Sequence, residues 1–178
     1  MRFETDPGYA KPFGGYVHGL RANIDGLLCY NQSMVPSYCQ MFRHGAVESV
    51  SAYPYFGVDN DSIATDYFKD AVMESLTGYL EALNSVGVPP PLVITVSLIG
   101  VKNLLFYPYG YNSAHLGGVK GKFDRSNITS VEVLLEDYSS NLYTALQPLW
   151  DSIWQSVGYS NCWWYLGTND WAKHAVHS

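Results

Sequence analysis

The sequence predicts an α+β fold, with a mostly antiparallel sheet and two amphipathic helices packed on one face. Short segments rich in Val, Ile, Tyr and Phe alternate with turn residues, which is typical of hairpin-connected strands. Two longer segments, near residues 62–86 and 139–158, repeat apolar residues at helical spacing. We expect residues 1–15 to form an extended arm and residues 16–178 a single domain, because 47% hydrophobic residues can fill one core.

The first strands are predicted at residues 16–20 and 24–30, joined by a polar segment. Residues 37–50 predict a hairpin with a two-residue turn at His44 and Gly45. A type I′ turn needs positive φ at both central positions, which Gly adopts freely and His tolerates. We therefore interpret His44 as a turn residue rather than as a metal ligand or general base.

Ser62 is predicted to cap the first helix, which ends near Val86 before Gly87 and a run of prolines. The second helix is expected to open at Ser139 or Ser140. Pro148 either kinks this helix or lies in the first turn of a helix that begins later.

Between and after the helices, the apolar pattern indicates further strands and one long connection. The predictions are a buried strand bent at Gly100, an exposed loop, a strand and a short final strand, at residues 92–105, 107–125, 129–136 and 162–166.

The charge composition argues against several classes of partner. Only 15% of residues are charged, the net charge is −6, and ten Lys and Arg residues are scattered along the chain. A protein that binds duplex nucleic acid usually concentrates basic residues, so we expect no direct duplex binding. With no apolar run of about 20 residues and no signal-peptide pattern, we also expect no membrane partner and a cytoplasmic location.

The sequence contains no motif for a nucleophile or a metal. Cys29, Cys39 and Cys162 are widely spaced, so we expect buried, reduced thiols and assign no metal, cofactor or catalytic residue. Lys120 and Lys122 follow two glycines and have the character of an anion-binding loop, but the P-loop pattern is missing and a surface loop is the alternative.

Two groups of side chains are candidates for binding a ligand or partner. The first is a polar cluster, although a turn at Asp25 and a weak surface ion pair between Arg43 and Glu48 are structural alternatives. The second is a set of tyrosines in loops, which form an interaction surface or simply a polar covering. The candidate residues are Arg21, Asp25, Arg43, Glu48, Tyr107 and Tyr109.

Three segments, at residues 21–27, 37–48 and 90–101, resemble in order the C-terminal part of certain bacterial proteins. Those proteins carry an N-terminal Schlafen-like, AlbA-type domain, to which DNA and ATP binding are ascribed. Residues 133–137 and 146–158 extend the resemblance over most of residues 21–158. No segment of this sequence resembles the AlbA-type domain, so its binding properties are carried to no residue here.

The resemblance implies an accessory domain that packs against, senses for or oligomerises an AlbA-type domain, in cis or in trans. Our leading hypothesis is a non-catalytic binding or regulatory module. One alternative is an enzyme that acts on a nucleotide or nucleic acid through the loop at residues 110–122. Another is a self-assembling structural domain that forms a homo-oligomer.

Overall fold

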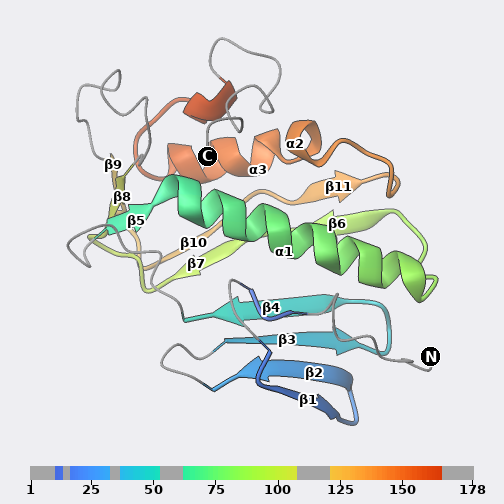
Figure 1. Ribbon diagram of the computed structural model, residues 1–178. Helices are drawn as coiled ribbons and strands as arrows, with labels where there is room; N and C mark the ends of the chain where they lie inside the picture. Colours follow the sequence, from blue (N-terminus) through green and yellow to red (C-terminus); the bar gives the residue numbers. More distant parts are fainter. Residues whose placement is uncertain (1–10, 14–16, 33–36, 53–61, 108–120, 166–178) are drawn as a thin grey trace. The chain divides into compact units, whose positions relative to one another are not determined.

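The computed structural model confirms the α+β class, with helices and mostly antiparallel strands (Figure 1). It describes residues 11–13, 17–32, 37–52, 62–107 and 121–165. The chain divides into two compact units: unit 1 comprises residues 1–55 and 65–89, and unit 2 comprises residues 56–64 and 90–178. The extended arm and the single domain over residues 16–178 stay predictions.

Unit 1 contains a four-stranded antiparallel sheet in the order β1-β2-β3-β4 and the helix α1 (Thr65–Ser85). The strands are β1 (Gly19–Ala22), β2 (Gly26–Asn31), β3 (Ser37–Phe42) and β4 (Val47–Ser51). Alternation along the strands places one set of side chains against the helix. The core that results contains Leu27, Cys29, Cys39, Met41, Tyr79 and Ala82, with Val47 packed against it.

The register of the β3–β4 hairpin differs by one residue from the prediction. Met41 faces Val47, and Gln40 faces Glu48. The predicted two-residue turn at His44 and Gly45 would pair Met41 with Glu48, and that pairing is wrong. A shift of one residue moves side chains to the opposite face of a sheet, so this difference changes which residues are neighbours.

The loop of this hairpin has three residues rather than two. The Phe42 amide donates to the Ala46 carbonyl at 2.8 Å, and the Gly45 amide donates to the Phe42 carbonyl at 3.0 Å. Gly45 has a φ of 92°, whereas His44 is not among the described residues with positive φ. A type I turn followed by a left-handed glycine needs only one such position, which is why the predicted type I′ turn does not form.

Helix α1 begins at Thr65 and not at the predicted cap, Ser62. Residues Ser62–Ala64 form strand β5, which pairs in parallel with β8 (Leu105–Tyr107). The end of the helix agrees with the prediction, because Gly87 follows it with a φ of 75°.

In unit 2, several short strands take the place of the single strand predicted at residues 92–105. The described strands of this unit, besides β5 and β8, are β6 (Leu92–Ile94), β7 (Ser97–Ile99), β9 (Gly121–Lys122), β10 (Asn127–Thr129) and β11 (Val133–Leu135). β6 pairs with β11, β7 with β10 and β9 with β8, all antiparallel. The bend predicted at Gly100 is present, with a φ of 76°.

The second predicted helix is two helices, α2 (Leu142–Ala145) and α3 (Gln147–Gln155). The residue that caps α2 is Asn141, whose side-chain oxygen accepts from the Thr144 amide at 3.2 Å, so the predicted start at Ser139 or Ser140 is wrong. Pro148 lies in the first turn of α3, which is the second of the two alternatives predicted for this proline.

Helix α3 supplies the centre of the unit 2 core. Its inward side chains are fully buried. The rings of Trp154 and Phe106 meet edge-on, with their centroids 5.3 Å apart. After α3, residues Trp163–Tyr165 form a single 3₁₀ turn, η2, where a final strand was predicted. The Cys162 amide anchors this turn by donating to the Asp151 carboxylate at 2.6 Å.

Candidate functional site

Arg43 holds the turn between β1 and β2. Its Nε donates to the Ile24 carbonyl at 3.0 Å and its Nη2 to the Asn23 carbonyl at 3.3 Å. Its backbone amide donates to the Asp25 carbonyl at 2.8 Å. Among the described residues, no ion pair joins Arg43 to Asp25 or Glu48. The guanidinium therefore acts as a clamp on the turn.

Asp25 lies in that turn, where its main chain is held by Asn23. The Asn23 side-chain oxygen accepts from the Asp25 amide at 3.0 Å and from the Gly26 amide at 2.7 Å. A side chain that bonds to the backbone two and three residues later is typical of a tight turn. The structural alternative for Asp25 thus accounts for its position.

Arg21 and Glu48 project from the same face of the sheet but from its two edge strands. The register places Leu28 and Gln40 between them, so three strand spacings, about 14 Å, separate their backbones. The Glu48 carboxylate accepts from the Tyr38 hydroxyl at 2.6 Å, which raises the pKa of the phenol. The four predicted polar residues are therefore not brought together in one site.

The predicted anion-binding loop lies largely outside the described residues, as do Tyr109, Lys120 and the side chain of Tyr107. Lys122 is exposed, but it belongs to β9 and not to a loop. A Cβ atom at Gly121 would lie 2.7 Å from the Val157 carbonyl oxygen, so close packing replaces the open loop predicted at this point.

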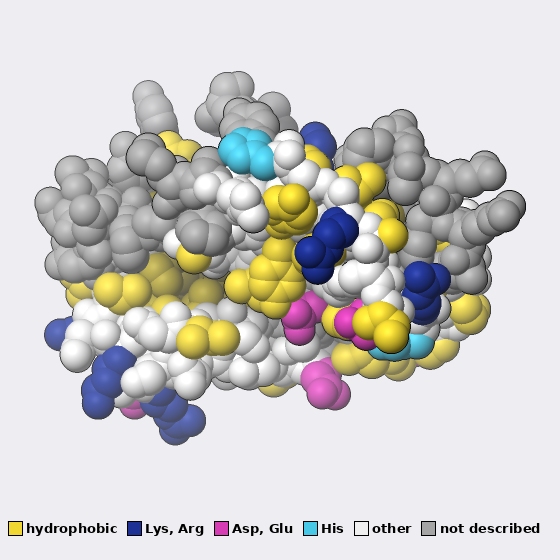
Figure 2. All heavy atoms as spheres, turned by 90° about the horizontal axis from the view of Figure 1, so that it is seen from below, with side chains coloured by type: hydrophobic (Ala, Val, Ile, Leu, Met, Phe, Trp, Pro, Cys, Tyr) yellow, Lys and Arg dark blue, Asp and Glu magenta, His cyan; other side chains and the backbone are white. Residues whose placement is uncertain are grey.

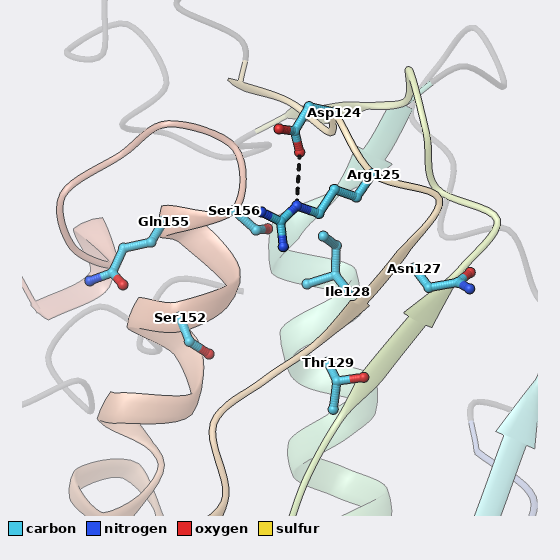
Figure 3. Close-up of a pocket in the computed structure, with 8 residues that line it drawn as sticks. All are labelled: Asp124, Arg125, Asn127, Ile128, Thr129, Ser152, Gln155 and Ser156. Carbon is cyan, nitrogen blue, oxygen red and sulfur yellow. Dashed lines mark ion pairs between the residues drawn. The ribbon is translucent and has the colours of Figure 1, made fainter.

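A polar hollow of about 340 Å³ lies beside the C-terminal end of α3 in unit 2. Figure 3 shows that Arg125, Ser152 and Ser156 face the space between α3 and the segment at residues 124–129. The lining residues are Asp124, Arg125, Asn127, Ile128, Thr129, Ser152, Gln155 and Ser156. We call this site the α3 hollow.

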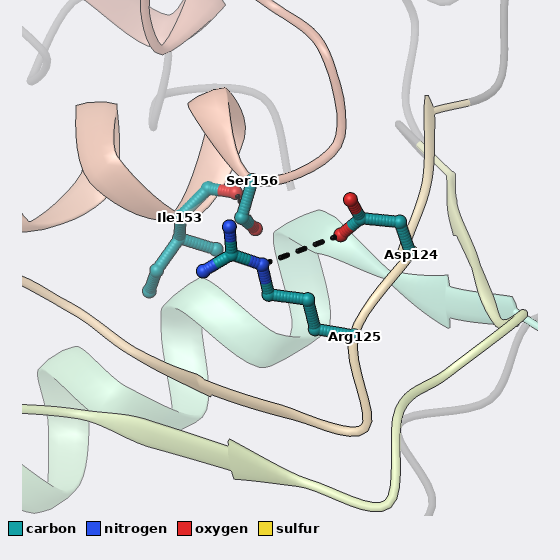
Figure 4. Close-up of polar contacts among 4 residues, drawn as sticks. All are labelled: Asp124, Arg125, Ile153 and Ser156. Atoms are coloured by element: carbon teal, nitrogen blue, oxygen red, sulfur yellow. Dashed lines mark hydrogen bonds and ion pairs between the residues drawn. The ribbon is translucent and has the colours of Figure 1, made fainter.

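Among the described residues that line the α3 hollow, Arg125 is the only basic one. Its Nε lies 3.9 Å from the Asp124 carboxylate, and its side chain is 78% exposed. Figure 4 shows the terminal nitrogens of the guanidinium directed away from Asp124, toward Ser156 and Ile153. The donors of Arg125 thus face the end of the helix.

The two serines of the α3 hollow use their protons within the helix. Ser152 Oγ donates to the Leu149 carbonyl at 2.7 Å, and Ser156 Oγ donates to the Ile153 carbonyl at 2.6 Å. The Ser152 oxygen also accepts from the Val131 amide at 3.1 Å. What the two hydroxyls can offer a ligand is therefore their remaining lone pairs and not their protons. Neither arrangement activates a serine as a nucleophile, which requires a general base to take the proton.

The charges around the α3 hollow nearly cancel. The positive charge of Arg125 is offset by Asp124 and by the partial negative charge at the C-terminal end of α3. An arginine that is also paired with a carboxylate attracts a free anion weakly. The hollow is thus better suited to an uncharged group that both accepts and donates hydrogen bonds.

Cys29 and Cys39 face each other across β2 and β3 as fully buried, free thiols. Burial raises the pKa of Cys29 to about 11. Burial and the neighbouring Cys29 raise the pKa of Cys39 to about 12. Because the thiolate is the reactive form of cysteine, this environment suppresses nucleophilic chemistry at both residues.

On the surface shown in Figure 2, the coloured Lys and Arg side chains lie singly or in small groups and form no continuous basic patch. No cluster of three or more His, Cys, Asp or Glu that could hold a metal is found in the described part of the chain. Within the same residues, none of the helices combines the length and apolar character needed to cross a membrane.

Comparison with known proteins adds no identity. No family model, curated protein or solved structure matches this chain. The resemblance to proteins with an AlbA-type domain therefore stays a prediction.

The α3 hollow was not predicted from the sequence. Its lining residues come from two segments, 124–129 and 152–156, that are separated by more than a helix and a strand. Local patterns place the serines only on the polar side of a helix. Their closeness to Arg125 depends on where α3 lies relative to residues 124–129, for which the sequence has no signal.

Proposed function

We propose that this chain is a non-catalytic binding module that holds a segment of a partner protein, and that the α3 hollow binds a peptide amide of that segment. The observation that carries the proposal is the arrangement of Arg125 opposite two hydroxyl oxygens, those of Ser152 and Ser156. A peptide group has a carbonyl on one side and an N–H on the other, which matches donors facing acceptors.

The exposure and composition of the residues that line the α3 hollow are consistent with binding rather than catalysis. Asp124 and Arg125 are 77% and 78% exposed, so neither is desolvated as a tuned acid or base usually is. Ile128, only 8% exposed, adds an apolar contact at the base. A volume of about 340 Å³ lies at the small end of the range for ligand pockets, which suits one or two residues of a peptide.

The partner that we propose is a domain of the Schlafen-like AlbA type, on the same chain or on another. This part of the proposal rests on the resemblance of residues 21–158 described above. In such a pair the present chain would act as a regulatory accessory, and binding to DNA or ATP would belong to the partner.

The direct test is an amide-resolved NMR titration with a short alanine peptide blocked at both ends. We expect shifts at residues 124–129 and 152–156, and a loss of affinity of about tenfold in Arg125→Ala. Arg125→Lys should recover little, because lysine lacks the planar fork of donors. Lys102→Ala, another exposed basic residue of unit 2, is the matched control and should bind as the parent does.

Sodium acetate and inorganic phosphate are titrated in parallel. If either anion shifts the same amides more strongly than the peptide, the site is an anion site and the peptide proposal is wrong. If the peptide shifts no amide of the α3 hollow, the hollow is not a binding site. Adding a purified AlbA-type domain then tests the partner, and unchanged spectra would exclude it.

A further inference from the structure

The outer face of the β6–β11 ribbon in unit 2 carries an exposed apolar pair. Val93 and Leu134 face each other across the two strands and are 62% and 52% exposed. Their neighbours Ile94, Val133 and Leu135 are at most 9% exposed, because alternation turns them to the opposite face. The pair is thus a contact between two aliphatic side chains that water surrounds on the outer side.

Two carboxylates flank this pair. Glu132 and Glu136 continue the alternation of β11 on either side of Leu134, and both are exposed. Within the described residues, neither forms an ion pair or a hydrogen bond. We call Val93, Leu134, Glu132 and Glu136 the acidic-apolar face.

We infer that the acidic-apolar face binds an extended protein segment in which an apolar residue stands between two basic ones. The apolar residue covers Val93 and Leu134, and each basic residue lies against one glutamate. On one side of a strand, successive side chains are two residues apart, both in the ligand and in β11. A ligand with lysine, leucine and lysine at alternate positions therefore matches the spacing of Glu132, Leu134 and Glu136.

The negative charges of the two glutamates favour a basic peptide segment over a second copy of the chain, a nucleic acid or a membrane. A second copy of the chain would set Glu132 and Glu136 against the same residues of its twin, and like charges brought together oppose association. The phosphates of a nucleic acid and the anionic lipids of a membrane would meet the same repulsion. The area is small, so the contact is a weak and salt-sensitive one.

The inference does not depend on the α3 hollow, and its test uses different residues. The probe is a blocked peptide with the sequence Lys-Thr-Leu-Thr-Lys, titrated into the labelled chain. Comparison peptides replace both lysines by glutamate or the leucine by serine. We expect the lysine peptide to shift the amides of residues 92–95 and 132–136, and to bind about fivefold more tightly than the glutamate peptide.

Variants of the chain complete the test. Reversing both charges, with Glu132→Lys and Glu136→Lys, should make the glutamate peptide the better ligand. The matched control reverses Glu74 and Glu81, two exposed residues of α1, and should keep the original preference. Leu134→Ser should weaken binding of the lysine peptide and of the glutamate peptide.

Three results would overturn the inference. They are equal affinity for the lysine and glutamate peptides, shifts confined to other residues, and sedimentation that shows a dimer of the parent chain that Leu134→Ser abolishes. The last result would assign the face to a second copy.

Discussion

The phenol oxygen of Tyr79 lies 2.7 Å from the hydroxyl oxygen of Ser49, which joins α1 to β4. The same phenol lies 2.8 Å from the Lys11 carbonyl oxygen, and the Ser49 hydroxyl accepts from the Phe13 amide at 3.0 Å. Two residues of the predicted arm are therefore bonded to the helix and the sheet of unit 1.

Tyr79→Phe should destabilise unit 1 by about 1 to 2 kcal/mol, because it removes a partner from buried groups that have lost their water. The free energy of unfolding in urea measures the change. Tyr30→Phe is the control, since the described residues provide no hydrogen bond to the Tyr30 hydroxyl. Equal losses for both variants would show that the contact with Ser49 contributes nothing specific.

Arg43→Ala should destabilise the protein by about 1 kcal/mol, because two backbone carbonyls of the β1–β2 turn lose their donor. Arg21→Ala removes an exposed arginine of the same sheet and should change stability by less than about 0.5 kcal/mol. Thermal unfolding of both variants distinguishes a clamp from a surface charge. A similar effect of the two substitutions would contradict the structural role of Arg43.

Gly45→Ala should cost about 1 kcal/mol or more, because alanine is strained at a φ of 92°. His44→Ala should cost less than about 0.5 kcal/mol, apart from its stacking on Phe42, since His44 needs no positive φ. A type I′ turn would make the two positions similarly sensitive. Chemical unfolding of both variants therefore tests the register of the hairpin.

Because the thiols of Cys29 and Cys39 are buried, we expect the protein to lose stability at high pH. In the folded chain the pKa values of Cys29 and Cys39 are about 11 and about 12, above the usual 9.0, so the unfolded chain releases these protons first. The stabilising contribution is fully present below pH 9 and declines as the pH rises through 11 and 12.

Urea unfolding between pH 7 and 11 measures this decline. The double variant Cys29→Ala, Cys39→Ala should show a shallower slope above pH 9, although burial also raises the pKa of Tyr79 and leaves part of the slope. An unchanged slope would mean that the thiols are not the groups that titrate.

The hairpin and the two helical regions were recognisable in the sequence because each depends on residues that are close along the chain. Gly87 ends α1, Pro148 lies in the first turn of α3, and Gly100 bends the chain, as their backbone preferences indicate. The helix starts were less predictable. Ser62 is a good cap by its chemistry, but pairing of β5 with β8 takes it into a strand.

In the candidate site, too, features that depend on neighbouring residues were predictable and those that depend on distant residues were not. The predicted two-residue loop placed Arg43 close to Glu48, but the loop has one residue more, which changes the register. The Arg43 side chain donates instead to carbonyls of the β1–β2 turn. Helical spacing, the α+β class and the turn glycines follow from local sterics and from apolar periodicity, which the sequence carries in neighbouring residues. Register, the division into small sheets and the meeting of Arg125 with Ser156 follow from long-range packing, whose energy depends on residues far apart in the chain.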